Sequence, residues 1–275
     1  MKKFLFMIIF ALAMTQSVFA TAQEGNVIFI DGEEWMLLGE PIMADSVLFQ
    51  RMKAVLPKDR SWTTANWDGY TSYWSLKQGH LYLDKITVKF FNNETKETLQ
   101  EEISKKEMEE LFKSYMKNGN IEGSMFSGKL RVAKGACISY VHMGFESRFE
   151  EETFFTMDKG KVTERKDYHN KVLGGADFSN QNDLSQVKKL FLEQVSGLPE
   201  FSEIKRLIFT VKNVKMDAQG HITDCDVIVK QAPEVFAQKM KDIIMSIRPW
   251  KRLYLYEEYV LPSYNSFSFS MIVKQ

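Results

Sequence analysis

The sequence is poor in cysteine and has no net charge, and each shortage excludes a class of protein. It has 275 residues but only 2 cysteines, so it is not a small fold held together by disulfides. Lysine plus arginine and aspartate plus glutamate each number 36, and their charges cancel. Without excess positive charge the chain has no general attraction for nucleic acid or anionic membranes, so we expect no nucleic-acid partner.

Catalytic and cofactor motifs are also missing. The sequence has no glycine-rich phosphate loop, no G-x-S-x-G nucleophile turn and no H-E-x-x-H zinc motif. Cys137 and His142 lie five residues apart in an expected strand, where their side chains point to opposite faces. The other histidines, His80, His169 and His221, have no metal-ligand spacing. We therefore expect no catalytic residues, no metal site and no cofactor.

The N-terminus has the pattern of a secretory signal peptide. Lys2 and Lys3 precede an apolar run, residues 4–14, that is too short to span a bilayer. Small residues before Ala20 and Ala22 predict cleavage after one of them, so residues 1–20 are the expected signal peptide and the protein is expected to be periplasmic or secreted. An uncleaved anchor is the alternative. After cleavage no stable membrane span is expected.

Export would permit a disulfide between Cys137 and Cys225. Both cysteines lie in segments with strand-like patterns, in what we interpret as different domains. Two separate buried thiols that behave as small apolar residues are the expectation, and a bridge is the alternative.

Residues 25–175 show the pattern of a mostly antiparallel α+β domain with packed helices. Asp31-Gly32 and Lys77-Gln78-Gly79, each between apolar runs, predict two hairpins. Helices are expected over residues 45–55 and 104–117. Ser104 begins the second helix with a capping box, in which Glu107 is its partner.

The remainder of this domain is expected to be a charged surface connection and a meander. The connection covers residues 92–102. Four strands follow, over residues 129–133, 136–143, 148–157 and 161–165, joined by turns at Gly135, Gly144 and 158–160. The polar stretch that begins at Gly174 marks the expected boundary, and residues 180–275 form the second domain.

The second domain predicts a strand, a turn, a second strand, a helix and a final aromatic strand. The first strand ends at Met216 with an alternation slip at Asn213, and residues 217–220 supply the turn. Residues 222–230 are the second strand. A helix follows Pro233 and ends before Pro249-Trp250, and residues 253–261 and 267–273 are aromatic strands.

This order resembles the C-terminal domain of TonB, the periplasmic protein that grips outer-membrane transporters. The resemblance covers residues 207–275 and rests on the turn at Asp217 and Gly220, on the pair Pro249-Trp250, and on Pro262 before the last strand. It implies a β-β-α-β domain with an exposed sheet edge that accepts a strand from a partner. An energy transducer would also need a permanent anchor and a proline-rich spacer, whereas this chain has only 6 prolines and a cleavable-looking signal.

The leading functional hypothesis is therefore a non-catalytic cell-envelope protein that binds a protein or peptide partner through this edge. The residues expected to contact the partner are Tyr256, Tyr259, Tyr264 and Phe267.

An aromatic segment in the first domain supports an alternative, a periplasmic hydrolase or glycan-binding accessory. Tyr70 and Trp74 share one face of an expected strand and fit a sheet core, whereas Trp67 and Tyr73 face the other way. If both faces are aromatic, one of them is a binding surface or a domain interface. Trp67 and Tyr73 are accordingly the candidate ligand-binding residues of this alternative, and Trp62 belongs to the same aromatic segment.

Overall fold

The computed structural model describes residues 24–92, 94–142, 144–202, 204–230, 232–262 and 266–272. The fold is α+β and rich in sheet. Two compact units are present: unit 1 holds the described residues up to 132 with 140–148 and 154–165, and unit 2 holds 133–139, 149–153 and the residues from 166 onward. The division falls inside three long strands, β8 (Gly128–Ser139), β9 (Arg148–Asp158) and β10 (Lys161–His169). The expected signal peptide lies outside the described residues.

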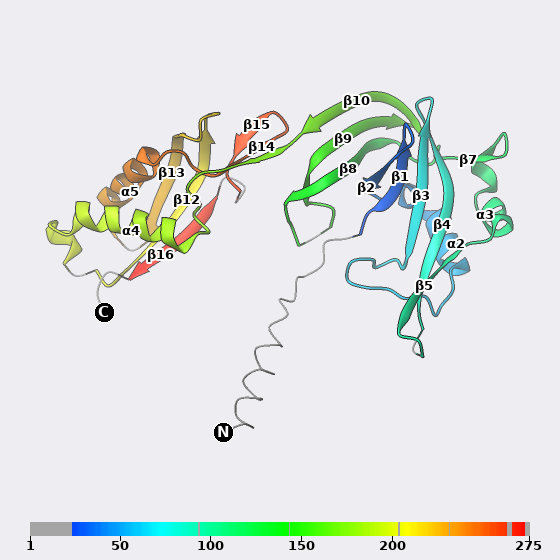
Figure 1. Cartoon of the computed structure of the whole chain (residues 1–275), viewed down its shortest axis with the longest axis horizontal. Coiled ribbons are helices and arrows are strands. Elements are labelled where there is room, and N and C mark those ends of the chain that lie inside the picture. The colour runs from blue at the N-terminus through cyan, green and yellow to red at the C-terminus, as the bar shows by residue number, and fades with distance from the viewer. Residues whose placement is uncertain are drawn as a thin grey trace, which may run out of the picture. The chain divides into compact units, whose positions relative to one another are not determined.

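Unit 1 is organised by a sheet whose strand order closes on itself (Figure 1). The order is β10-β9-β8-β2-β1-β3-β4, and β4 pairs back to β10 at His80 and Lys161. Strand β1 pairs antiparallel with β2, β3 with β4, and β4 with β5, β7 and β10, whereas β1 and β3 are parallel. The further strands are β1 (Asn26–Ile30), β2 (Glu33–Leu37), β3 (Tyr70–Lys77), β4 (His80–Asn92), β5 (Glu97–Glu102), β6 (Met116–Lys117) and β7 (Asn120–Glu122).

The two predicted hairpins of unit 1 are confirmed, and their turns explain why. Asp31 and Gly32 have φ of 53° and 84°, and Gln78 and Gly79 have φ of 51° and 74°. Turns with two positive φ values match the twist of the flanking strands, and glycine adopts that conformation without steric cost. The turns therefore fix the register of β1 with β2 and of β3 with β4.

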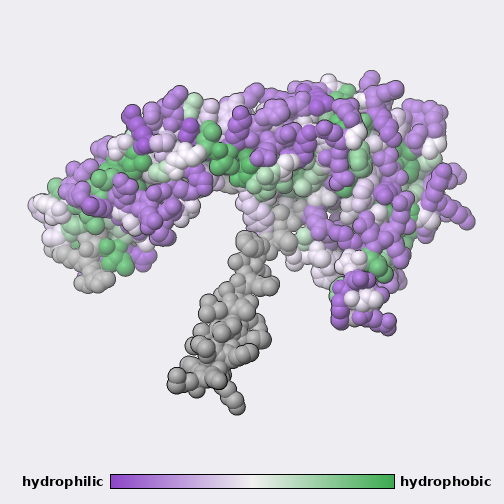
Figure 2. Space-filling model, viewed as in Figure 1, coloured by the Kyte–Doolittle hydropathy of each residue, from purple (hydrophilic) through white to green (hydrophobic). Residues whose placement is uncertain are grey.

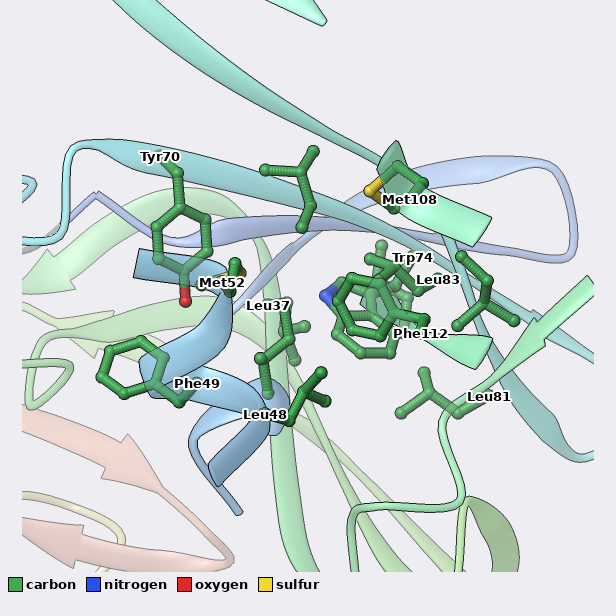
Figure 3. Packing of buried hydrophobic residues seen from close by; sticks show 14 of the residues in the cluster. Leu37, Leu48, Phe49, Met52, Tyr70, Trp74, Leu81, Leu83, Met108 and Phe112 are labelled. Atoms are coloured by element: carbon green, nitrogen blue, oxygen red, sulfur yellow. The ribbon is translucent and has the colours of Figure 1, made fainter. Parts of the chain in front are cut away.

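Two helices cover the apolar side of this sheet. Helix α2 (Ser46–Val55) is capped by Asp45, whose carboxylate accepts from the amides of Val47 and Leu48 at 3.0 Å. Helix α3 (Lys105–Leu111) begins at the predicted capping box. Figure 3 shows the side chains of α2 near those of β2 and β3, with Trp74 and Phe112 fully buried in the same cluster.

The described part of unit 2 includes two small sheets and two α-helices. Its first sheet has the order β13-β12-β16, and α4 and α5 lie on one face of it (Figure 1). The second sheet has the order β11-β14-β15. The elements are β11 (Lys171–Leu173), α4 (Gln181–Val195), β12 (Arg206–Met216), β13 (Ile222–Lys230), α5 (Glu234–Ser246), β14 (Arg252–Leu255), β15 (Glu258–Val260) and β16 (Phe267–Ile272).

Several expected elements differ in the structure. Residues 97–102 were expected in a surface connection but form the exposed strand β5, because they pair with β4. Gly135 is not a turn: β8 continues through it, with a φ of 82°. The segment 253–261 is not one strand, because Tyr256 and Glu257 form a turn with positive φ between β14 and β15. Helix α3 also ends earlier than expected, at Leu111.

The cysteines also differ from expectation. Both are free: Cys225 is buried and Cys137 is exposed. Both lie in unit 2 rather than in separate units. Cys225 alone fits the expected small buried thiol.

The surface is mainly polar in the view of Figure 2, where hydrophobic residues appear as small separate patches. Among the described residues, no helix combines the length and the apolar character needed to cross a membrane.

Candidate functional site

Strand β16 lies at one edge of the β13-β12-β16 sheet. It pairs antiparallel with β12, from Val211 opposite Phe267 to Arg206 opposite Ile272, and has no other strand partner among the described residues. In an antiparallel ladder, successive residues alternate between bonding to the neighbour and pointing away from it. About half of the backbone amides and carbonyls of β16 therefore face away from β12.

The two edges of this sheet differ in charge. Strand β13, at the opposite edge, has the sequence ITDCDVIVK and carries Asp224, Asp226 and Lys230. Strand β16 has the sequence FSFSMI, without a charged residue. Charged side chains on an edge strand prevent pairing with other chains, so β13 carries this protection and β16 does not.

A groove of about 600 Å³ follows β16. Four consecutive residues of the strand, 267–270, line the groove. Because neighbouring residues of a strand point to opposite faces of the sheet, we infer that the groove runs along the edge of the strand rather than over one face. The other residues come from the segment before α4, from α4 itself and from the segments around β14 and β15. Its lining consists of Ala176, Asp177, Phe178, Ser179, Gln181, Leu184, Lys188, Lys251, Leu261, Pro262, Phe267, Ser268, Phe269 and Ser270.

The apolar part of the groove is a fixed stack of rings. Phe178 is the middle ring of three. Its ring is stacked on that of Trp250, with centroids 4.0 Å apart, and its centroid lies 3.6 Å from that of Phe267. Trp250 is fully buried, and its indole nitrogen donates to the carbonyl of Ile244 at 2.9 Å. Because Trp250 is anchored in the core, Phe178 and Phe267 are held in place before any ligand binds.

The charged part of the groove contains two lysines. Lys251 forms an ion pair with Asp177, with its Nζ 2.6 Å from the carboxylate. Burial raises the pKa of Asp177, but hydrogen bonds from Lys251 and Ser179 outweigh it and hold that pKa below its ordinary value. Lys188 forms no ion pair with another described residue, so the described lining of the groove offers one positive charge that is not neutralised within it.

Of the predicted partner-binding residues that the structure describes, Tyr256, Tyr259 and Phe267, only Phe267 lines this groove. Tyr256 lies in the β14–β15 turn, and its hydroxyl donates to the buried carboxylate of Glu152 at 2.5 Å. Tyr259 lies on β15 with its ring 4.9 Å from that of Tyr254. Tyr264 lies outside the described residues. The structure therefore places Tyr256 and Tyr259 together on one hairpin and Phe267 in a different sheet.

The aromatic residues of the segment 67–74 fall into a buried pair and two side chains outside the core, as the sequence alternation predicts. Tyr70 and Trp74 are buried, whereas Trp67 is 67% exposed. Tyr73 lies on the outer face of β3, where the Lys85 ammonium sits 4.7 Å from its ring and Gln100 donates to its hydroxyl at 3.1 Å. Trp67 and Tyr73 do not line a common pocket among those described.

Sequence reasoning missed Phe178, Lys188 and Lys251 as groove residues. Phe178 is the one large apolar residue in a polar stretch, residues 177–183, and that isolation was the available signal. The lysines gave no signal, because their positions in the groove depend on tertiary packing.

The described residues contain no group of three or more His, Cys, Asp or Glu side chains arranged to hold a metal ion. Asp224 lies 2.9 Å from Lys241, whose hydrogen bond and charge lower the pKa of Asp224. His221 lies 2.9 Å from Asp217. Both pairs are exposed or half-exposed contacts on unit 2.

No family model, no curated protein and no solved structure matches this chain.

Proposed function

We propose that this is an exported, non-catalytic cell-envelope protein that binds a protein or peptide partner as an added strand along β16. The observation that carries the proposal is the edge strand β16, which has no charged residue and lies along a groove, whereas β13, at the opposite edge of the same sheet, carries charges. Main-chain hydrogen bonds from the edge would supply affinity, and the groove would select side chains of the partner.

The groove chemistry suggests the kind of segment that fits. An extended chain presents alternate side chains to one side, at about 6.6 Å spacing. An apolar side chain of the partner would pack against Phe178 and Phe267, and an acidic one would lie near Lys188. The preferred partner is accordingly an extended segment with both apolar and acidic residues.

The TonB resemblance supports the same proposal. Strands β12 and β13, helix α5 and strand β16 follow one another along the chain in this order, with β14 and β15 between α5 and β16, and Pro249-Trp250 follows the helix. The β14–β15 hairpin before the last strand is an additional element. The proposal carries over strand addition alone, and not energy transduction.

Site-specific photocrosslinking in intact cells tests the proposal. A photoreactive amino acid would replace Ser270 on β16 and, as the matched control, Ile228 on β13, which is exposed on the opposite edge. We expect a discrete crosslinked product from position 270 and none of the same mass from position 228. Adding the substitution Ser268→Lys should abolish the product, because a charge would then protect the edge.

Equal crosslinking from both positions would contradict strand addition at β16. So would a product that survives Ser268→Lys in a protein whose thermal unfolding is unchanged.

A further inference from the structure

Unit 1 contains a second groove, of about 650 Å³, on the outer face of β3, β4 and β5. Directly opposed residues share a face of a sheet, and the opposed pairs here are Thr71 with Thr87, Lys89 with Gln100, and Phe91 with Thr98. The loop that connects α2 to β3 forms the facing wall. That wall contributes Ser61, Trp62, Thr63, Asn66 and Gly69.

The wall of this groove is held in place by hydrogen bonds. The amide of Ser61 donates to the carbonyl of Lys89 at 2.6 Å, which ties the loop to β4. The Asn66 side chain donates to the carbonyl of Tyr70 at 2.9 Å and accepts from the amide of Gly69 at 2.9 Å. Arg60 donates to the carbonyls of Pro57 and Asp68. The groove is therefore formed before a ligand binds, which lowers the entropic cost of binding.

Two exposed rings stand in the groove, Trp62 at 68% and Phe91 at 50% exposure. The two rings line one preformed groove rather than standing singly on the surface, so together they offer an apolar surface to a ligand. The lining also offers the hydroxyls of Thr71 and Thr98, which both donate and accept hydrogen bonds. The Gln100 amide nitrogen already donates to Tyr73 and Thr87, so this side chain offers its oxygen as an acceptor.

The charges in the groove cancel. Lys89 lies 3.2 Å from the carboxylate of Glu24, and these are the charged residues of the lining. A groove with no net charge gives no electrostatic advantage to an anionic or cationic ligand. Its volume lies within the range of about 300–1,000 Å³ that is usual for small-ligand sites.

We propose that this groove binds a neutral oligosaccharide. The C–H face of a sugar ring is apolar and packs on an aromatic ring, while its hydroxyls need groups that both donate and accept, as the threonine hydroxyls do, and acceptors such as the Gln100 oxygen. The site uses Trp62 and Phe91 rather than Trp67 and Tyr73, which the sequence alone suggested. It lies in unit 1 and is independent of the binding proposed at β16.

Titration calorimetry with neutral hexasaccharides tests the site. The probes are the hexamers of β-1,4-glucose, α-1,4-glucose, β-1,4-mannose and β-1,4-N-acetylglucosamine, with a galacturonic acid hexamer and a capped extended peptide of threonine and valine as comparisons. We expect at least one neutral hexamer to bind with a Kd of about 1 mM or tighter. Trp62→Ala should weaken this binding by about tenfold or more, because it removes a stacking ring.

Trp67→Ala is the matched control. Trp67 is equally exposed in the same loop but does not line the groove, so this variant should bind as the unaltered protein does. Thermal unfolding of both variants should be unchanged, because both rings are exposed. Three results would each overturn the proposal: no binding of any neutral hexamer, binding of the acidic hexamer or the peptide alone, or equal losses from the two tryptophan variants.

Discussion

At the scale of single residues, Glu40 is a largely buried carboxyl with a shifted pKa. Burial raises its pKa to about 7, against the lowering effect of hydrogen bonds with Asn26 and Tyr70, and the charge of Asp68 raises it further. The Tyr70 hydroxyl donates to this carboxyl at 2.9 Å. Below about pH 7 the protonated form of Glu40 is therefore favoured in the folded protein.

This shift predicts a pH dependence of stability. Since the folded pKa is raised, the contribution of Glu40 is fully present below its ordinary pKa of 4.5 and is lost as the pH rises through about 7. Glu40→Gln keeps an acceptor for Tyr70 but cannot ionise. We expect the free energy of unfolding to fall by about 1–3 kcal/mol between about pH 5 and pH 8 in the unaltered protein, and much less in Glu40→Gln.

Denaturant unfolding at a series of pH values measures this difference. Glu34→Gln, on an exposed position of β2, is the control and should keep the pH dependence. Identical pH profiles for Glu40→Gln and the unaltered protein would contradict this explanation.

A second residue-scale prediction concerns the irregularity in β12. Asn213 has a φ of 52°, and the pairing with β13 shifts register between Lys212 and Lys215. Positive φ costs a β-branched residue more than asparagine or glycine. We expect Asn213→Val to lower the free energy of unfolding by about 1–2 kcal/mol and Asn213→Gly to lower it less, as measured by urea unfolding. Equal losses would show that the side chain, rather than the backbone conformation, decides stability here.

At the scale of elements, local capping and turn chemistry determined which segments could be predicted. The two hairpins of unit 1, the start of α3 and the slip in β12 follow from signals within a few residues of each element. Strand β5 lacked such a signal, because its six residues ETLQEE are all exposed and form a strand through pairing with β4. Gly135 predicted a turn, but β8 continues through it with a φ of 82°, and the Ala136 amide donates to the Glu150 carboxylate at 2.9 Å.

The capping box of α3 gives an element-scale prediction. The Ser104 hydroxyl accepts from the amide of Glu107 at 3.3 Å, and the Glu107 carboxylate accepts from the amide of Ser104 at 3.2 Å. Ser104→Ala should lower the free energy of unfolding by about 1 kcal/mol, because an amide of the first turn loses its acceptor. Lys106→Ala, at an exposed position of the same turn, should be nearly neutral. Comparable losses in thermal unfolding for both would argue against the cap as the cause.

At the scale of the whole molecule, the two proposed sites lie in different units and were visible in the sequence to different degrees. The aromatic strand β16 and Phe267 could be predicted from alternation near the C-terminus. Phe178 and Lys188 could not, because tertiary packing of α4 and the segment before it brings them to the groove. In unit 1, the signal was the group of aromatic residues, but the loop hydrogen bonds decide that Trp62 rather than Trp67 lines the groove.

Hydrogen exchange of the backbone amides, with and without a partner captured at position 270, tests the central claim most directly. If the partner adds as a strand, alternate amides within residues 267–272 should exchange more slowly in the complex, since they gain acceptors, while the amides of β13 should be unchanged. Unchanged exchange in β16, or new protection along β13 instead, would contradict strand addition at this edge.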